Sequence, residues 1–191
     1  MAKSVTLPTL LTWLRICILP IIVIIFYVPD SVLAMDSKNL FSTIIFAFAA
    51  LTDYLDGYLA RLLKQETSFG AFLDPVADKA IVVACLVILV YLQRTFWWGA
   101  IIIISREIAI SALREWMVQL GKVKNLAVAY IGKVKTTIQM ISIGLLLFDY
   151  HGKYINTNYI GNIFMAVAVA TTILSMLYYL KQAQKQFKNI D

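Results

Sequence analysis

Four aspartates stand in two pairs whose spacing places both members of a pair on one side of a helix. Asp53 and Asp56 are three residues apart, and Asp74 and Asp78 are four apart, so each pair makes neighbours on a helix surface. The surrounding sequence is apolar, where an ionisable group is costly and usually functional. Four carboxylates at one depth repel each other strongly unless they are protonated or bind cations.

Divalent-metal binding is the chemistry that suits such a cluster best. Carboxylate oxygens are the hard ligands that Mg²⁺ and Mn²⁺ prefer. Two metals about 3.5–4 Å apart can hold a diphosphate and stabilise both the attacking and the leaving oxygens of a displacement. The structural alternative is a set of capping or ion-paired aspartates, with Arg61 and Lys79 as partners. Two pairs of aspartates, each on one helix face and each with a glycine nearby, favour the metal site over this alternative.

Small residues beside the aspartates leave room for a nucleotide. Gly57 follows the first pair directly and Ala60 lies about one turn further on, so the backbone of this helix face is nearly bare. Arg61 is placed to contact a phosphate or to balance the carboxylates. Gly70, four residues before the second pair, is expected in the first turn of the next helix.

The elements that must position these residues are apolar segments, which predict an all-α, polytopic membrane protein. The 191-residue chain is 61% hydrophobic and only 15% charged, whereas soluble domains are about a quarter charged. Most segments approach the roughly 20 residues that a helix needs to cross the hydrocarbon, and lipid-exposed backbone must be helical. About six transmembrane helices are expected, within residues 10–28, 40–63, 78–92 (extended back to about 71), 96–113, 127–148 and 159–180. No linker divides residues 1–191, so a single domain is expected.

The basic residues predict that both termini are cytoplasmic, because cytoplasmic loops are enriched in Lys and Arg. The opposite side offers only three cations, Lys38, Arg94 and Lys153. With this orientation all four aspartates lie near the cytoplasmic surface. The net charge of +6 favours anionic lipid headgroups and a phosphorylated substrate over nucleic acid, because the positive residues form no stripe.

The aspartates and their neighbours form one extended motif: Asp53-x-x-Asp56-Gly57-x-x-Ala60-Arg61, eight residues, Gly70, three residues, Asp74, three residues and Asp78. Every fixed position resembles the signature of the CDP-alcohol phosphatidyltransferases. The resemblance implies that the first three aspartates bind two metals, Mg²⁺ or Mn²⁺, which grip the diphosphate of a CDP-linked donor. It implies that the last, Asp78, is both a metal ligand and the general base. The CDP pocket would be completed by Gly57, Ala60, Arg61, Gly70 and Thr12.

Charges in the later segments indicate a phosphorylated acceptor. Arg106 and Glu107 lie in the fourth segment, and Lys133 and Lys135 lie in the fifth. Glu107 is a natural salt-bridge partner for a neighbouring cation. The cations still exceed the acids, so a substrate phosphate would complete the site. The phosphate would be held by some of Arg106, Lys133 and Lys135, with Arg114 and Arg15 as further candidates.

The wider sequence, from about residue 5 to 180, resembles the bacterial members of this family that use sn-glycerol 3-phosphate. The implied reaction is direct displacement, in which the acceptor hydroxyl attacks the phosphatidyl phosphorus of CDP-diacylglycerol. The products would be phosphatidylglycerol phosphate and CMP. The resemblance also implies a homodimer in the bacterial inner membrane, with membrane lipids around it and an active site that faces the cytoplasm.

Three other functions remain open. The same chemistry can use another alcohol, such as inositol phosphate, serine or phosphatidylglycerol. An aspartate-rich prenyltransferase also binds a diphosphate through Mg²⁺, but it usually needs more spans and a different motif. A divalent-cation transporter would use the four carboxylates as a midplane site. Here the carboxylates cluster toward one face, and no acidic group marks an exit on the other.

Overall fold

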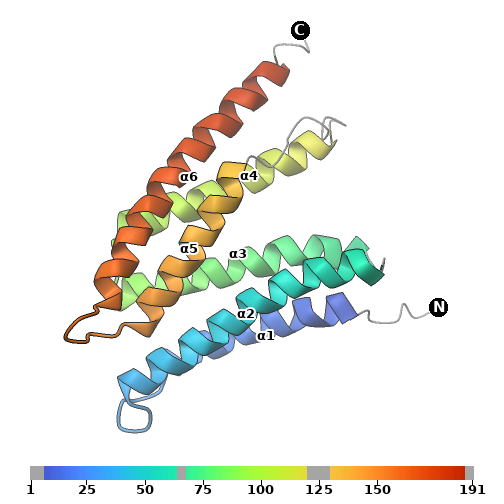
Figure 1. Cartoon of the computed structure of the whole chain (residues 1–191). Helices are drawn as coiled ribbons and strands as arrows, with labels where there is room; N and C mark the ends of the chain where they lie inside the picture. The colour runs from blue at the N-terminus through green and yellow to red at the C-terminus, as the bar shows by residue number, and fades with distance from the viewer. Residues whose placement is uncertain (1–6, 64–67, 120–129, 188–191) are drawn as a thin grey trace.

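The computed structural model describes residues 7–63, 68–119 and 130–187, and these residues form six α-helices and no strand (Figure 1). The all-α prediction is therefore confirmed, and each helix contains most of one predicted apolar segment. The helices are α1 (Leu7–Tyr27), α2 (Met35–Leu63), α3 (Ser68–Tyr91), α4 (Trp97–Gln119), α5 (Tyr130–Phe148) and α6 (Thr157–Phe187).

The helices converge at one end of the molecule and spread apart toward the other (Figure 1). The converging end carries the α1–α2 and α5–α6 loops, and α1 begins and α6 ends at the spread end. Helix α1 packs on α2 and α3, while α6 packs on α4 and α5. Helix α3 also contacts α4 and α5, and α2 contacts α5, so α2 and α3 both join the two groups of helices.

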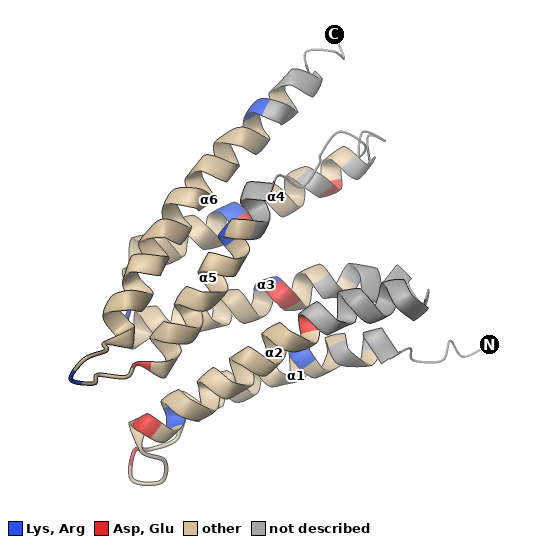
Figure 2. Ribbon diagram, in the orientation of Figure 1, with Lys and Arg blue, Asp and Glu red and all other residues tan. Residues whose placement is uncertain are grey.

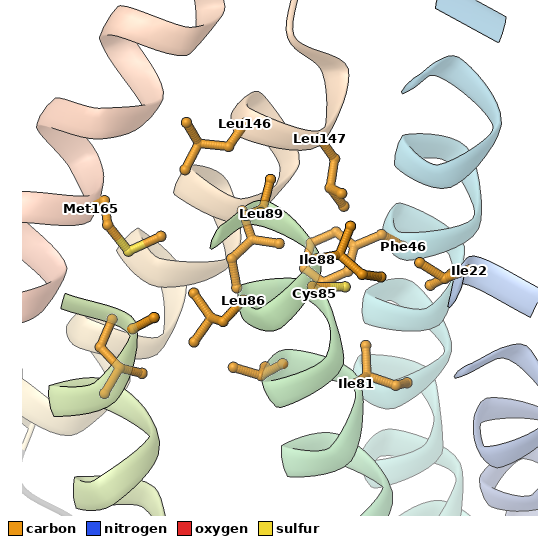
Figure 3. Close-up of a cluster of buried hydrophobic side chains, with 14 of the residues drawn as sticks. Ile22, Phe46, Ile81, Cys85, Leu86, Ile88, Leu89, Leu146, Leu147 and Met165 are labelled. Carbon is orange, nitrogen blue, oxygen red and sulfur yellow. The ribbon is translucent and has the colours of Figure 1, made fainter. Parts of the chain in front are cut away.

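The hydrophobic core is built around one side of α3, where Ile81, Cys85, Ile88 and Leu89 recur at helical spacing. Figure 3 shows these side chains against residues of α1, α2, α5 and α6, namely Ile22, Phe46, Leu146, Leu147 and Met165. A fully buried side chain of this size stabilises the fold by about 1.5–3 kcal/mol. Asp78 lies one turn before Ile81, so the core also fixes the position of this aspartate.

Helices α5 and α6 approach closely at Gly161. The Ser142 hydroxyl of α5 donates a hydrogen bond of 2.8 Å to the Gly161 carbonyl oxygen of α6. A Cβ atom at position 161 would lie only 2.8 Å from Cγ of Leu146. The absence of a side chain at this glycine therefore lets the two helices pack.

Buried Arg94, between α3 and α4, fastens the converging end of the bundle. Its Nη2 donates to Oδ1 of Asn39 at 2.8 Å, and its Nη1 donates to the Leu147 carbonyl oxygen at 3.1 Å. Nε lies 3.0 Å from Oδ2 of Asp149, and Asn162 donates to the Arg94 carbonyl oxygen at 2.9 Å. The guanidinium also suits the negative end of the α5 dipole. Sequence patterning treated Arg94 as an ordinary loop cation, whereas it links α2, α5 and α6.

The outer surface of the bundle is strongly apolar, as expected for a protein in lipid. Large side chains on several helices are more than half exposed, including Ile24, Ile44, Ile101 and Leu174, and exposure on this scale marks a lipid or protein contact. Among the described residues, one stretch, Thr157–Lys181, is long and apolar enough to cross a membrane. Two shorter apolar stretches are Thr12–Tyr27 and Val134–Phe148. The full number of spans and the side on which the termini lie stay predictions.

Candidate active site

Two of the four aspartates converge on one buried guanidinium, which belongs to Arg15 of α1. Its Nη1 donates a hydrogen bond of 2.7 Å to Oδ1 of Asp53 on α2. The same nitrogen donates to Oδ1 of Asp78 on α3. In Figure 2 the ribbon of α1 carries a basic position near acidic positions on the ribbons of α2 and α3. The Asp53 and Asp78 carboxylates, 25 residues apart in sequence, therefore lie close together, as the orientation of the two helices predicted.

The burial of the three side chains is unequal. Arg15 is 1% exposed, whereas the side chains of Asp53 and Asp78 are 50% and 41% exposed. The guanidinium thus contacts the carboxylates from inside the bundle, and each carboxylate keeps an open side. Thr12 lies one turn before Arg15 on α1 and is fully buried.

The remaining members of the aspartate motif lie in helices, but their side chains are outside the described residues. Asp56, Gly57, Ala60 and Arg61 belong to the last turns of α2. Gly70 and Asp74 belong to the first turns of α3. In the part of the chain whose side chains are described, no group of three His, Cys, Asp or Glu residues is placed to hold a metal ion. The four-aspartate site therefore stays a prediction.

A second charged cluster joins α4, α5 and α6. Glu107 accepts a hydrogen bond from Nζ of Lys135, and its Oε1 lies 3.2 Å from Nη1 of Arg106. Arg106 and Lys135 are buried, at 7% and 1% exposure. The expectation that Glu107 forms a salt bridge is confirmed. One carboxylate serves two buried cations, which leaves the cluster with an excess positive charge.

Two residues of α6 complete the surroundings of Arg106. The Ser175 Oγ lies 3.2 Å from Nη2 of Arg106. The ring of Tyr179, which is fully buried, lies 5.8 Å from Cζ of Arg106, within the range of a cation–π contact. Nε of Arg106 is buried, and the described residues offer it no hydrogen-bond partner.

Sequence reasoning missed both α6 residues. Ser175 and Tyr179 are four positions apart, so they share a helix face. A serine and a tyrosine in an apolar span are also common as packing residues, and the spacing alone carries no further signal. Only the packing of α6 on α4 brings them to Arg106.

The two charged clusters are neighbours across α3. Lys79 follows Asp78 directly and lies within electrostatic range of Glu107. Two further predicted phosphate ligands, Arg114 on α4 and Lys133 on α5, have side chains outside the described residues.

Comparison with known proteins shows the family of the chain. A family model described as CDP-alcohol phosphatidyltransferase matches residues 5–174, which is most of the chain. The chain belongs to the CDP-alcohol phosphatidyltransferase family. The resemblance that the aspartate motif indicated is therefore confirmed.

Curated relatives within the family carry one common name. A CDP-diacylglycerol–glycerol-3-phosphate 3-phosphatidyltransferase of Haemophilus influenzae is 50% identical over 180 residues, covering 93% of each chain. Proteins of the same name from Salmonella choleraesuis and Shigella flexneri are 46% and 45% identical over 181 residues, covering 93% of this chain and 94% of each relative.

The described donors suit a hard divalent cation. Asp53 and Asp78 supply carboxylate oxygens, they already share one cationic partner, and both side chains are about half exposed. A carboxylate pair offset by a single guanidinium can accept further positive charge. These two residues therefore fit the metal that the motif predicts.

Proposed function

We propose that this chain transfers the phosphatidyl group of CDP-diacylglycerol to sn-glycerol 3-phosphate, releasing CMP and forming phosphatidylglycerol phosphate. The complete aspartate motif supports the donor chemistry. The shared name of relatives that match 93% of the chain supports the acceptor. The observation that carries the proposal is the meeting of Asp53 and Asp78, from two different helices, at one buried guanidinium.

Donor binding is assigned to the ends of α2 and α3 that carry the motif. The family uses divalent cations. Two of them, Mg²⁺ or Mn²⁺, would be held by Asp53, Asp56, Asp74 and Asp78, and when bound they would offset the charge that builds on the leaving diphosphate. Further contacts to cytidine and phosphate are assigned to Gly57, Ala60, Arg61, Gly70 and Thr12.

Asp78 is assigned as the general base. It accepts the proton of the acceptor 1-hydroxyl, and the hydroxyl oxygen then forms a bond to the phosphatidyl phosphorus. The bond between that phosphorus and the CMP oxygen breaks in the same displacement, so no covalent enzyme intermediate forms. Its half-exposed carboxylate is accessible to such a hydroxyl, whereas a fully buried one would not be.

The acceptor phosphate is assigned to the cluster on α4 and α5. Arg106 and Lys135 share Glu107, so a phosphate would supply the missing negative charge. Lys133 and Arg114 are assigned as additional ligands, and Lys79, the residue after Asp78, adds positive charge near Glu107.

We also propose how the protein lies in the membrane. We assign the six helices as spans of the bacterial inner membrane, with one domain over residues 1–191, both termini in the cytoplasm and a homodimeric assembly. The exposed Trp97 and Trp98 at the start of α4 suit the interface opposite the aspartates. The apolar outer surface supports contact with lipid, through which the acyl chains of the donor would enter.

Transfer of labelled sn-glycerol 3-phosphate into lipid tests the proposal. Purified protein receives CDP-diacylglycerol and Mg²⁺, with serine and inositol phosphate as competing acceptors. Labelled phosphatidylglycerol phosphate, lost with EDTA and in Asp78→Asn, is the expected result. CMP release with a different acceptor would overturn the acceptor assignment alone. A folded protein that releases no CMP with any acceptor would overturn the reaction.

A further inference from the structure

Arg15 is the charged group whose surroundings the proposed reaction does not explain. A guanidinium that is 1% exposed inside a membrane helix carries a high desolvation cost unless it is well paired. Sequence reasoning placed it among the acceptor-phosphate ligands. The structure instead places its Nη1 against the carboxylates of Asp53 and Asp78, while Arg106 and Lys135 gather separately around Glu107.

Arg15 contacts two carboxylates at once, and its function depends on both of them. Asp53 and Asp78 come from different helices, and in the metal-free protein their charges repel. One nitrogen bonded to both carboxylates holds the ends of α2 and α3 together and removes much of that repulsion. Because Arg15 is buried while the two carboxylates are about half exposed, the carboxylates stay accessible to a cation.

We propose that Arg15 is the built-in counter-ion of the metal site, a positioning residue that holds Asp53 and Asp78 together in the metal-free protein and competes with divalent cations for them. The inference rests on the proposed function in taking these aspartates as metal ligands. It adds that one of the two negative charges is already offset before metal arrives. Metal binding then replaces an existing interaction, so Arg15 weakens metal affinity in return for a stable empty site.

Thermal unfolding of the full-length protein in detergent, with EDTA or with Mn²⁺ and without substrate, tests this. Arg15→Met keeps the length of the side chain and removes its charge, so the empty site loses stability while the loaded site loses much less. We expect the Mn²⁺-induced rise in Tm to exceed that of the wild type by about 2–4 °C. We also expect Mn²⁺ affinity, measured from the electron paramagnetic resonance of free Mn²⁺, to increase about fivefold.

Lys38→Met is the matched control. Lys38 is also buried, and its Nζ lies 2.6 Å from Oδ1 of Asp30 at the other end of α2. Removal of this charge should lower Tm equally with and without Mn²⁺. Equal losses in Arg15→Met would overturn the inference, because they would assign Arg15 to packing alone. Unchanged or weaker Mn²⁺ affinity, or a selective rise in KM for sn-glycerol 3-phosphate, would overturn it as well.

A second variant and the response of the wild type to Mn²⁺ complete the test. If Arg15→Met does not fold, Arg15→Lys retains the charge as a single ammonium that cannot bridge two carboxylates as a guanidinium does. A larger Mn²⁺-induced rise than in the wild type supports the inference, and an equal or smaller one overturns it. A wild type that gains no stability from Mn²⁺ would overturn the metal assignment itself. If Mn²⁺ raises the Tm of the wild type and of the variant equally, only the function proposed for Arg15 would be overturned.

Discussion

Glu107→Gln tests the electrostatics of the acceptor cluster most directly. Glutamine is nearly isosteric with glutamate but neutral, so the change leaves Arg106 and Lys135 buried, at 7% and 1% exposure, without their shared carboxylate. Loss of one partner of a buried ion pair typically costs about 3–5 kcal/mol. For a chain of this size each kcal/mol lowers Tm by roughly 2–4 °C. We therefore expect a decrease of about 6–20 °C.

The assay is thermal unfolding in detergent, followed by tryptophan fluorescence. Asp30→Asn is the matched control because Asp30 is also the carboxylate partner of a buried lysine, Lys38, yet its own side chain is 67% exposed. Water and ions can replace an exposed carboxylate, so this variant should lose about 0–1 kcal/mol. Added inorganic phosphate should restore part of the stability of Glu107→Gln and none of that of Asp30→Asn. A Glu107→Gln protein as stable as the wild type, or equal losses in the two variants, would refute the reasoning.

The remaining predictions concern the base, α6 and helix packing. Asp78→Asn should reduce CMP release by at least about 100-fold, as expected for loss of a general base; circular dichroism should show an unchanged helix content, and near-normal turnover would assign the base elsewhere. Tyr179→Leu removes the ring beside the α4 arginine, so KM for sn-glycerol 3-phosphate should rise while KM for CDP-diacylglycerol stays constant. Tyr179→Phe, which keeps the ring, should raise this KM less than Tyr179→Leu in the same steady-state assay, and a parallel change in both KM values would contradict this reading. Gly161→Ala places a Cβ atom 2.8 Å from Cγ of Leu146 and should cost about 1–3 kcal/mol by overpacking. Gly144→Ala meets no atom within 4 Å and should leave Tm unchanged or higher in the same thermal scan, so equal losses at the two glycines would count against close packing of α5 on α6.

Hydropathy was sufficient to predict the six helices because lipid-facing backbone must satisfy its own hydrogen bonds. The start of α3 is the informative case. Its apolar run is clean only from about residue 78, and an extension back to about 71 was needed to cross the hydrocarbon. The helix begins at Ser68, so even the residues around Asp74 and Pro75 are helical. Here the length that a span requires was a better guide than local composition.

The charged groups were predicted less completely, because their partners depend on which helices pack together. The spacing of Asp53 and Asp78 relative to their helices predicted that they meet, but nothing in the sequence indicated that Arg15 lies between them. The sequence did indicate Glu107 as a salt-bridge partner, since basic residues lie both in its own helix and in the next one along the chain. Ser175 and Tyr179 carry no charge, so only the tertiary contact of α6 with α4 reveals their proximity to Arg106.

The network around Arg94 also makes the bundle unequal along its length. Hydrogen bonds from α2, α5 and α6 meet at one residue, whereas toward the aspartates the helices diverge (Figure 1). Local opening is easiest where few buried contacts must break. Backbone amides near the α3–α4 loop should therefore exchange with deuterium slowest, and those at the start of α1 and the end of α6 fastest. If the exchange follows this order, the fastened end would let the opposite end of the bundle open without loss of the core.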